Sequence, residues 1–193
     1  MPSLAAGRQK ALSDGCRARI RSSGAAFCFL LLLFYGLAPA LAPGASLEYQ
    51  VKAAFLFNFT KFVEWPSSAF ADASSPFLVC IFGSDPFGRA LDDIIEGESV
   101  EGHKITVQRI NTETPQACHV LYSGENTMPP WSTAAASSVL TVGEGDRVLS
   151  RGGIIAFVID NGRVRFDISL KAASKQGLKL SSKLLSVARN VER

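Results

Sequence analysis

The chain has 193 residues, of which 47% are hydrophobic and 19% are charged. This length is enough for one domain with a hydrophobic core, and the composition excludes an intrinsically disordered protein. The formal net charge of +3 comes from the first 40 residues, which hold five basic side chains and one acidic side chain. Residues 41–193 hold 15 basic and 16 acidic side chains, so no excess positive charge favours a nucleic-acid partner.

The first 40 residues have the pattern of a secretory signal peptide. A basic segment precedes an apolar run at 25–37, which is shorter than the roughly 20 residues that span a bilayer. Cleavage after Ala40 would place alanine at both positions that require a small side chain. We therefore expect residues 1–40 to be removed on export, with 41–46 as a flexible mature N-terminus. An uncleaved N-terminal membrane anchor is the alternative.

Two cysteines, Cys80 and Cys118, remain after the expected cleavage. An even pair in an oxidising compartment favours a disulfide bond, and both residues lie in apolar runs typical of strands. A bridge closing 38 residues would contribute about 4 kcal/mol in the chain-entropy description. The alternative is a pair of buried free thiols.

The first expected element of the mature chain is a helix over 47–64, which begins after Ser46 and ends before Pro66. Apolar residues at helical spacing predict its buried face; these are Leu47, Val51, Phe55, Phe59 and Phe62. Phe57 lies off this stripe, and neither Phe57 nor Trp65 has an obvious place in the core. The alternative interpretation is a helix that is buried over most of its surface.

The remaining segments alternate between strand and helix patterns. We expect strands at 77–83, 105–110, 118–122 and 139–142, and helices at 87–95, 131–137, 170–176 and 183–190. Strands at 154–160 and 163–168 should form a hairpin, because Asn161-Gly162 suits the positive φ angles of a type I′ turn. These elements predict a single α/β domain over 47–190, with a mixed β-sheet flanked by helices and a C-terminal β-hairpin followed by helices.

The sequence shows no pattern of a catalytic centre. It has two histidines, His103 and His119, and His119 follows Cys118 in a strand, where neighbouring side chains point to opposite faces. A metal site on that pair is therefore not expected, and no Gly-x-Ser-x-Gly elbow is present. The segment 83–88 (GSDPFG) lacks the Lys-Ser/Thr pair of a phosphate-binding loop and reads as a strand-to-helix turn. We expect no enzymatic activity, no metal and no cofactor.

Two surfaces are candidates for binding. Aromatic side chains are enriched at binding hot spots, which makes Phe57, Lys61 and Trp65 the expected partner-binding residues. From residue 163 onward the chain has eight basic and two acidic side chains. Its basic residues include the candidates for contact with an anionic ligand, namely Arg165, Lys175, Lys179 and Lys183. A buried helix and an ordinary solvated basic surface are the alternative interpretations.

Three stretches of the chain resemble the YfiR/HmsC-like family of periplasmic proteins, which is classed as a domain of unknown function. The first is VKAAFLFNFTKFVEWP at 51–66, and the second is CHVLY at 118–122. The third is GGIIAFVIDNGRVRFDISL at 152–170, which continues as GLKLSSKLL at 177–185. Because the order and spacing of the blocks fit, the resemblance covers nearly all of 47–190.

The resemblance implies a negative regulator that binds the periplasmic sensor domain of an inner-membrane diguanylate cyclase and keeps cyclic-di-GMP synthesis and biofilm formation low. It also implies an outer-membrane lipoprotein that sequesters the repressor, and a homodimer. The family's strand cysteines match Cys80 and Cys118, whereas the second cysteine pair of some repressors is absent from this chain. The alternative function is a periplasmic ligand-binding or sensor-input module that serves a histidine kinase or a TonB-type receptor.

Overall fold

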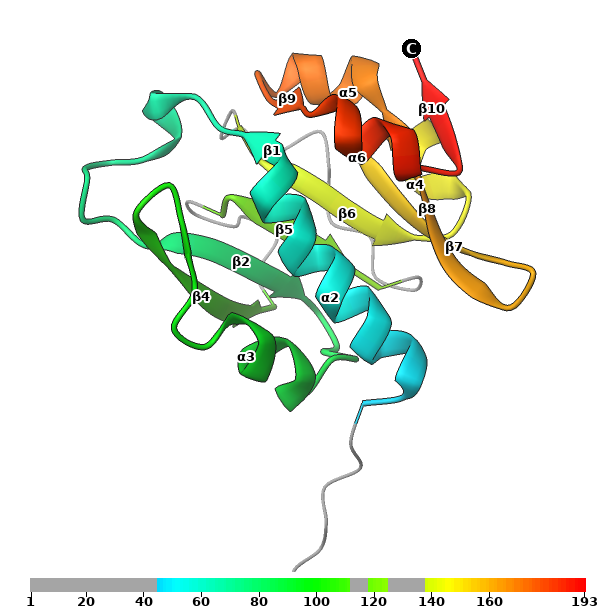
Figure 1. Ribbon diagram of the computed structural model, residues 1–193, viewed down its shortest axis with the longest axis horizontal. Helices are drawn as coiled ribbons and strands as arrows, with labels where there is room; N and C mark the ends of the chain where they lie inside the picture. The colour runs from blue at the N-terminus through cyan, green and yellow to red at the C-terminus, as the bar shows by residue number, and fades with distance from the viewer. Residues whose placement is uncertain (1–44, 112–117, 125–137) are drawn as a thin grey trace, which may run out of the picture. The chain divides into compact units, whose positions relative to one another are not determined.

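The computed structural model describes residues 45–111, 118–124 and 138–193. The expected signal peptide, its cleavage site and the expected helix at 131–137 lie outside these residues. Figure 1 shows the described part as a mixed β-sheet with helices packed on it. The expected fold class, a single α/β domain with a mixed sheet, flanking helices and a C-terminal hairpin, is confirmed.

The main sheet has eight strands in the order β10-β8-β7-β6-β5-β2-β4-β3. The strands from β4 through β2, β5 and β6 to β7 are parallel, β8 and β3 are antiparallel to β7 and β4, and β10 is parallel to β8. Central strand β2 is buried along almost its whole length, as its continuous apolar sequence FLVCIF predicts. The strand bounds are β2 (Phe77–Phe82), β3 (Ser99–Val100), β4 (His103–Ile110), β5 (Val120–Ser123), β6 (Leu140–Glu144), β7 (Ile155–Asp160), β8 (Arg163–Ser169) and β10 (Asn190–Glu192).

Figure 1 shows helix α2 lying across one face of this sheet, with α3 on one side of it and α6 on the other. Ser169 and Ser181 cap α5 and α6, since their side-chain oxygens accept hydrogen bonds from the main-chain N–H group of the third residue of each helix. The side chain of Ser46 makes no such bond to α2. The helices are α2 (Leu47–Phe62), α3 (Arg89–Ile95), α4 (Arg147–Ser150), α5 (Leu170–Lys175), α6 (Ser182–Val187) and the short 3-10 helix η1 (Ser67–Ala69).

The buried face of α2 differs from the expected stripe. Phe59 is buried as expected, but Leu47 and Val51 are 75% and 38% exposed, and Phe55 and Phe62 are only half-buried. The fully buried residues are instead Lys52, Ala53, Leu56, Phe59 and Thr60. Two of these are polar and have partners inside the fold: Lys52 pairs with carboxylates, and Thr60 donates a hydrogen bond to the Phe57 carbonyl. A prediction from apolar periodicity alone therefore gives a buried face that is rotated around the helix axis relative to the observed one.

Short strands that join distant segments end two of the predicted helices early. Helix α2 ends at Phe62 because β1 (Val63–Glu64) pairs with β9 (Lys179–Leu180) in a separate two-stranded sheet. Helix α6 ends at Val187, and β10 then pairs with β8 at the edge of the main sheet. The hairpin between β7 and β8 is confirmed, with positive φ angles of 49° at Asn161 and 72° at Gly162.

The disulfide bond between Cys80 and Cys118 is also confirmed, with the two Cα atoms 5.9 Å apart. Cys80 lies on β2, and Cys118 lies just before the neighbouring strand β5. Both residues belong to a small apolar cluster with Phe82, Leu121 and Val139. This cluster is separate from the main core, which contains Val79 and Ile81 from the other face of β2 together with the buried side of α2. The disulfide therefore lies on the sheet face that α2 does not cover.

Candidate partner-docking site

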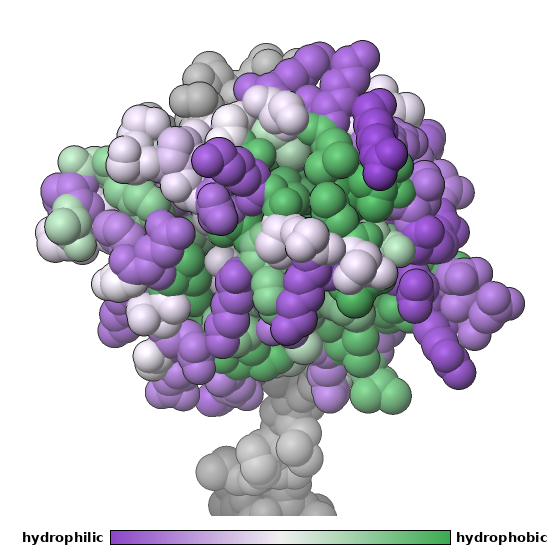
Figure 2. All heavy atoms as spheres, turned by 45° about the horizontal axis from the view of Figure 1, so that its top comes forward, coloured by the Kyte–Doolittle hydropathy of each residue, from purple (hydrophilic) through white to green (hydrophobic). Residues whose placement is uncertain are grey.

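An apolar groove lies between α2 and α6 and encloses a cavity of about 280 Å³. Its wall consists mostly of apolar side chains, which are buried or half-buried except for the exposed Val187, with Asn58 and Lys183 as the polar members; the apolar residues are Phe55, Phe59, Phe62, Phe166, Leu184 and Val187. We call this the α2–α6 groove. Figure 2 shows a hydrophobic area over these helices with hydrophilic side chains around it. Val187 at the groove is 53% exposed, so part of the apolar surface contacts solvent.

The aromatic rings of the groove form one packed group with the sheet below. Phe55 contacts the rings of Phe157 and Phe166, with centroids 6.3 Å and 5.5 Å away, and Phe59 lies 5.0 Å from Phe166. Lys183 extends over the ring of Phe62, with its Nζ atom 5.2 Å from the centroid. Among the described residues that line the groove, Lys183 is the one with a charged side chain. A surface of this kind suits an apolar group with a negative charge beside it.

The opposite flank of α2 carries two of the three expected partner-binding residues. The Nζ atom of Lys61 lies 4.0 Å from the ring centroid of Phe57 and 3.4 Å from a carboxylate oxygen of Glu98. Phe57 is half-buried and packs against the core, whereas Lys61 is exposed. The structure therefore brings Phe57 and Lys61 together, on the side of α2 that faces α3.

Trp65 does not belong to this surface, and the expectation that it has no place in the core is wrong. It is 6% exposed, and its ring lies edge-on against Phe77 with centroids 4.9 Å apart. Its indole N–H donates a hydrogen bond of 3.3 Å to the His119 carbonyl, which satisfies the polar end of the buried ring. The sequence gives no sign of this contact, because it joins residues 54 positions apart.

The four basic candidates for an anionic ligand lie on four different elements. Arg165 is on β8, Lys175 on α5, Lys179 on β9 and Lys183 on α6, and all four are exposed. Lys183 lines the α2–α6 groove, whereas Lys175 lines a different hollow beside α5. The structure therefore distributes these residues over the C-terminal region and does not gather them around one cavity.

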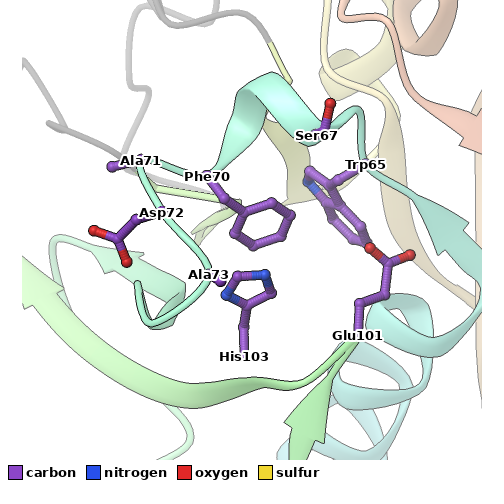
Figure 3. A pocket seen from close by; sticks show the side chains of 8 residues that line it. All are labelled: Trp65, Ser67, Phe70, Ala71, Asp72, Ala73, Glu101 and His103. Carbon is purple, nitrogen blue, oxygen red and sulfur yellow. The ribbon is translucent and has the colours of Figure 1, made fainter.

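A stack of aromatic rings lies next to Trp65. His103 and Phe70 are stacked with centroids 3.9 Å apart, and Phe70 is also stacked on His119 with centroids 4.6 Å apart. Figure 3 shows Phe70 and His103 facing each other beside Trp65, at a hollow with Asp72 and Glu101 on its rim. The Nδ1 atom of His103 donates to the Ser75 carbonyl, since a carbonyl can only accept. The stack thus fixes the segment between η1 and β2 on the sheet.

His119 is held in its neutral form within this stack. Burial lowers the pKa of its ring, the Ala69 carbonyl offsets part of that effect, and the charge of His103 lowers the pKa further. The Nδ1 atom accepts a hydrogen bond from the Leu78 N–H at 3.0 Å, which a neutral ring with its proton on Nε2 can do. The Nε2 atom is buried and makes no hydrogen bond within the described part of the chain.

The lowered pKa of His119 predicts that acid destabilises the fold. In the unfolded chain the His119 ring takes up a proton near pH 6.5, whereas the ring in the folded protein has a lower pKa and stays neutral. The contribution of neutral His119 to the free energy of unfolding is therefore complete above pH 6.5 and is lost as the pH falls from there toward the folded pKa. Urea unfolding at several pH values should show this loss. His119→Asn keeps an acceptor for the Leu78 N–H and should reduce the slope. An equal slope in both proteins would contradict the prediction.

A buried ionic network joins α2 to the carboxyl end of β6. The Nζ atom of Lys52, which is 2% exposed, lies 2.9 Å from Glu144 and 2.5 Å from Glu48. Tyr122 donates a hydrogen bond to Glu144, and the hydroxyl of Tyr49 lies 3.5 Å from the same carboxylate. Burial alone would lower the pKa of Lys52, but its bonds to the two carboxylates outweigh this and raise it. The sequence does not predict this network, because Lys52 and Glu144 lie far apart along the chain.

The turn after β2 has its main-chain donors in use. The Asp85 carboxylate accepts hydrogen bonds from the N–H groups of Phe87 and Gly88, so these donors are not free for a phosphate. The same carboxylate pairs with Arg109, which also binds Asp92. Within the described ranges no three His, Cys, Asp or Glu side chains are grouped so that they could hold a metal ion. In the same ranges no helix has the length and apolarity needed to cross a membrane.

The fold and the site define the class of protein: a disulfide-linked α/β domain with an aromatic groove on its surface. The family model described as YfiR/HmsC-like matches residues 49–189, a range that includes all three blocks of the sequence resemblance in full. The chain therefore belongs to the YfiR/HmsC-like family. This is a family of periplasmic regulatory proteins, and it suggests a protein partner.

Proposed function

We propose that this protein is a periplasmic repressor of an inner-membrane diguanylate cyclase, which it binds through the cyclase's periplasmic sensor domain. Its effect is to keep cyclic-di-GMP synthesis and biofilm formation low. Membership of a family of periplasmic regulators supports this function. The observation on this chain that carries the proposal is the α2–α6 groove, an aromatic surface that is open to a partner.

The proposed mechanism is a shift in the population of two cyclase conformations. A repressor that binds the inactive conformation of the sensor domain more tightly than the active one moves the equilibrium toward the inactive state. The groove selects an apolar side chain of the sensor, and Lys183 at its edge favours an acidic neighbour. Because most of the contact is apolar, we expect affinity to depend only weakly on salt concentration.

Export and assembly complete the proposal. Residues 1–40 act as a cleaved signal peptide, and the mature chain reaches the periplasm in solution. It forms a homodimer, which light scattering of the purified protein tests directly. An outer-membrane lipoprotein sequesters the repressor and thereby releases the cyclase.

Deletion of the gene should raise cellular cyclic-di-GMP and biofilm formation. The measurement is the cyclic-di-GMP content of the deletion strain, of the same strain with the gene restored, and of a strain that also lacks the cognate cyclase. The third strain should return to a low level. Unchanged cyclic-di-GMP in the deletion, while the membrane cyclases are expressed, would overturn the proposed function.

Complementing the deletion strain with genes that encode surface variants locates the docking site. Val187→Asp places a charge at the groove on an exposed position, and should weaken binding to the sensor domain by about tenfold or more without unfolding the protein. Leu47→Asp makes the same kind of change outside the groove and is the matched control. Lys61→Ala tests the Phe57–Lys61 flank. Repression lost only in Lys61→Ala would move the docking site to that flank.

A further inference from the structure

A second hollow, of about 420 Å³, lies between the end of α4 and helix α5. It shares no residue with the α2–α6 groove. Three of its lining side chains are cationic, Arg151, Lys171 and Lys175, and none of the described residues that line it is acidic. A volume of this size is typical of small-molecule sites.

The two lysines of this hollow repel each other, and the described residues offer them no acidic partner. Lys171 and Lys175 lie one turn apart on α5, so their side chains are on the same side of the helix. Neither lysine has an ion-pair partner within the part of the chain that the structure describes, in contrast to Lys52 and Lys61. Like charges at this spacing destabilise a helix, and a bound anion would remove that cost.

The polar groups around the lysines are also arranged as donors. The side-chain oxygen of Gln176 accepts hydrogen bonds from the main-chain N–H groups of Ser138 and Val139, at 3.1 Å and 3.3 Å. These bonds fix the amide group and leave its NH₂ end, which can only donate, for the hollow. The side-chain oxygen of Ser169 accepts from the Ala172 N–H at 3.3 Å, so its hydroxyl hydrogen remains available to a ligand.

We propose that this hollow binds a small oxyanion with two or more negative charges, either a phosphate or a polycarboxylate. Lys171 and Lys175 provide the charge, and the NH₂ group of Gln176 and the hydroxyl of Ser169 orient the oxygen atoms. Such a ligand stabilises the folded protein, because it binds a site that the unfolded chain does not have. The inference does not depend on the proposed docking to a cyclase, since the two sites share no residues.

The test measures binding and stability with the purified protein, its disulfide intact. Inorganic phosphate and citrate are titrated separately by calorimetry and by thermal unfolding, against sodium chloride at the same ionic strength. We expect phosphate, citrate or both to raise the midpoint temperature of unfolding. The anion that does so shows whether the site prefers a phosphate or a polycarboxylate. Amide chemical shifts should change around residues 149–152 and 169–176.

Charge-removing variants assign the binding to the hollow. The double variant Lys171→Gln and Lys175→Gln should weaken anion binding by about tenfold or more, because each lysine supplies a charge-assisted hydrogen bond. Lys104→Gln removes an exposed lysine on β4, which lies near the opposite edge of the sheet from β8, the strand that leads into α5. This change should leave the affinity for the anion unchanged. Without anion, the double variant should be at least as stable as the wild type. An equal response to phosphate, citrate and chloride would overturn the proposal, and so would equal losses in the double variant and in Lys104→Gln.

Discussion

Replacing both Cys80 and Cys118 by alanine should lower the free energy of unfolding by about 4 kcal/mol. The bridge closes a loop with a sequence separation of 38 residues, and its loss returns that conformational freedom to the unfolded chain. For a domain of this size such a loss is a large part of the total stability. The two sulfur atoms are buried, so alanine avoids placing a new polar group in the core. Urea unfolding of the double variant measures the effect.

The reduced wild type serves as the control for this experiment. If closure of the loop is the cause, reduction should destabilise the wild type by nearly the same amount and should leave the double variant unchanged. The remaining difference reports the lost packing of the sulfur atoms in the cluster with Phe82, Leu121 and Val139. A double variant as stable as the oxidised wild type would show that the bridge contributes nothing.

Lys52→Met should lower stability by about 3 to 5 kcal/mol, the usual cost of leaving one partner of a buried ion pair alone. Methionine has a similar volume, so the change removes the charge while most of the packing remains. It leaves Glu144, which is largely buried, without its cation and beside the hydroxyl groups of Tyr122 and Tyr49. Glu48 is half exposed and can turn to solvent, so its loss of a partner costs little.

A second substitution separates the missing charge from a disturbed helix. Glu144→Gln in the Lys52→Met background removes the unpaired charge. Its amide oxygen can still accept from the Tyr122 hydroxyl, and its NH₂ group can donate to the hydroxyl oxygen of Tyr49. The double variant should recover much of the lost stability, and a double-mutant cycle measures the coupling. Equal stability of the single and double variants would show that Lys52 acts through its packing alone.

Local patterns predicted the parts of the fold that depend on neighbouring residues. The Asn161-Gly162 turn and the apolar strand β2 follow from turn geometry and from an apolar run, and the structure has both. The disulfide was also predictable, because export and an even number of cysteines both favour it.

Contacts between distant residues account for what the sequence could not predict. Lys52 looks like a surface residue until β6 places Glu144 beside it, and this is why the buried face of α2 was misplaced. Trp65 looks available to a partner in the sequence because its acceptor, the carbonyl of His119 just before β5, lies far along the chain. Of the candidate site, the sequence pointed to the aromatic helix α2, but the groove itself needs α6 and β8, whose positions only the fold supplies.

The two-residue ladder between β1 and β9 has a consequence for recognition. It pairs Val63 with Leu180, and a further main-chain bond of 2.9 Å runs from the Ser181 N–H to the Phe62 carbonyl. The end of α2 and the start of α6 are thus tied by backbone, so the width of the groove does not rely on its side chains. The groove is therefore ordered before a partner binds, and binding costs little conformational entropy on this side of the interface. Changes to the lining can then alter which partner is accepted while the opening keeps its dimensions.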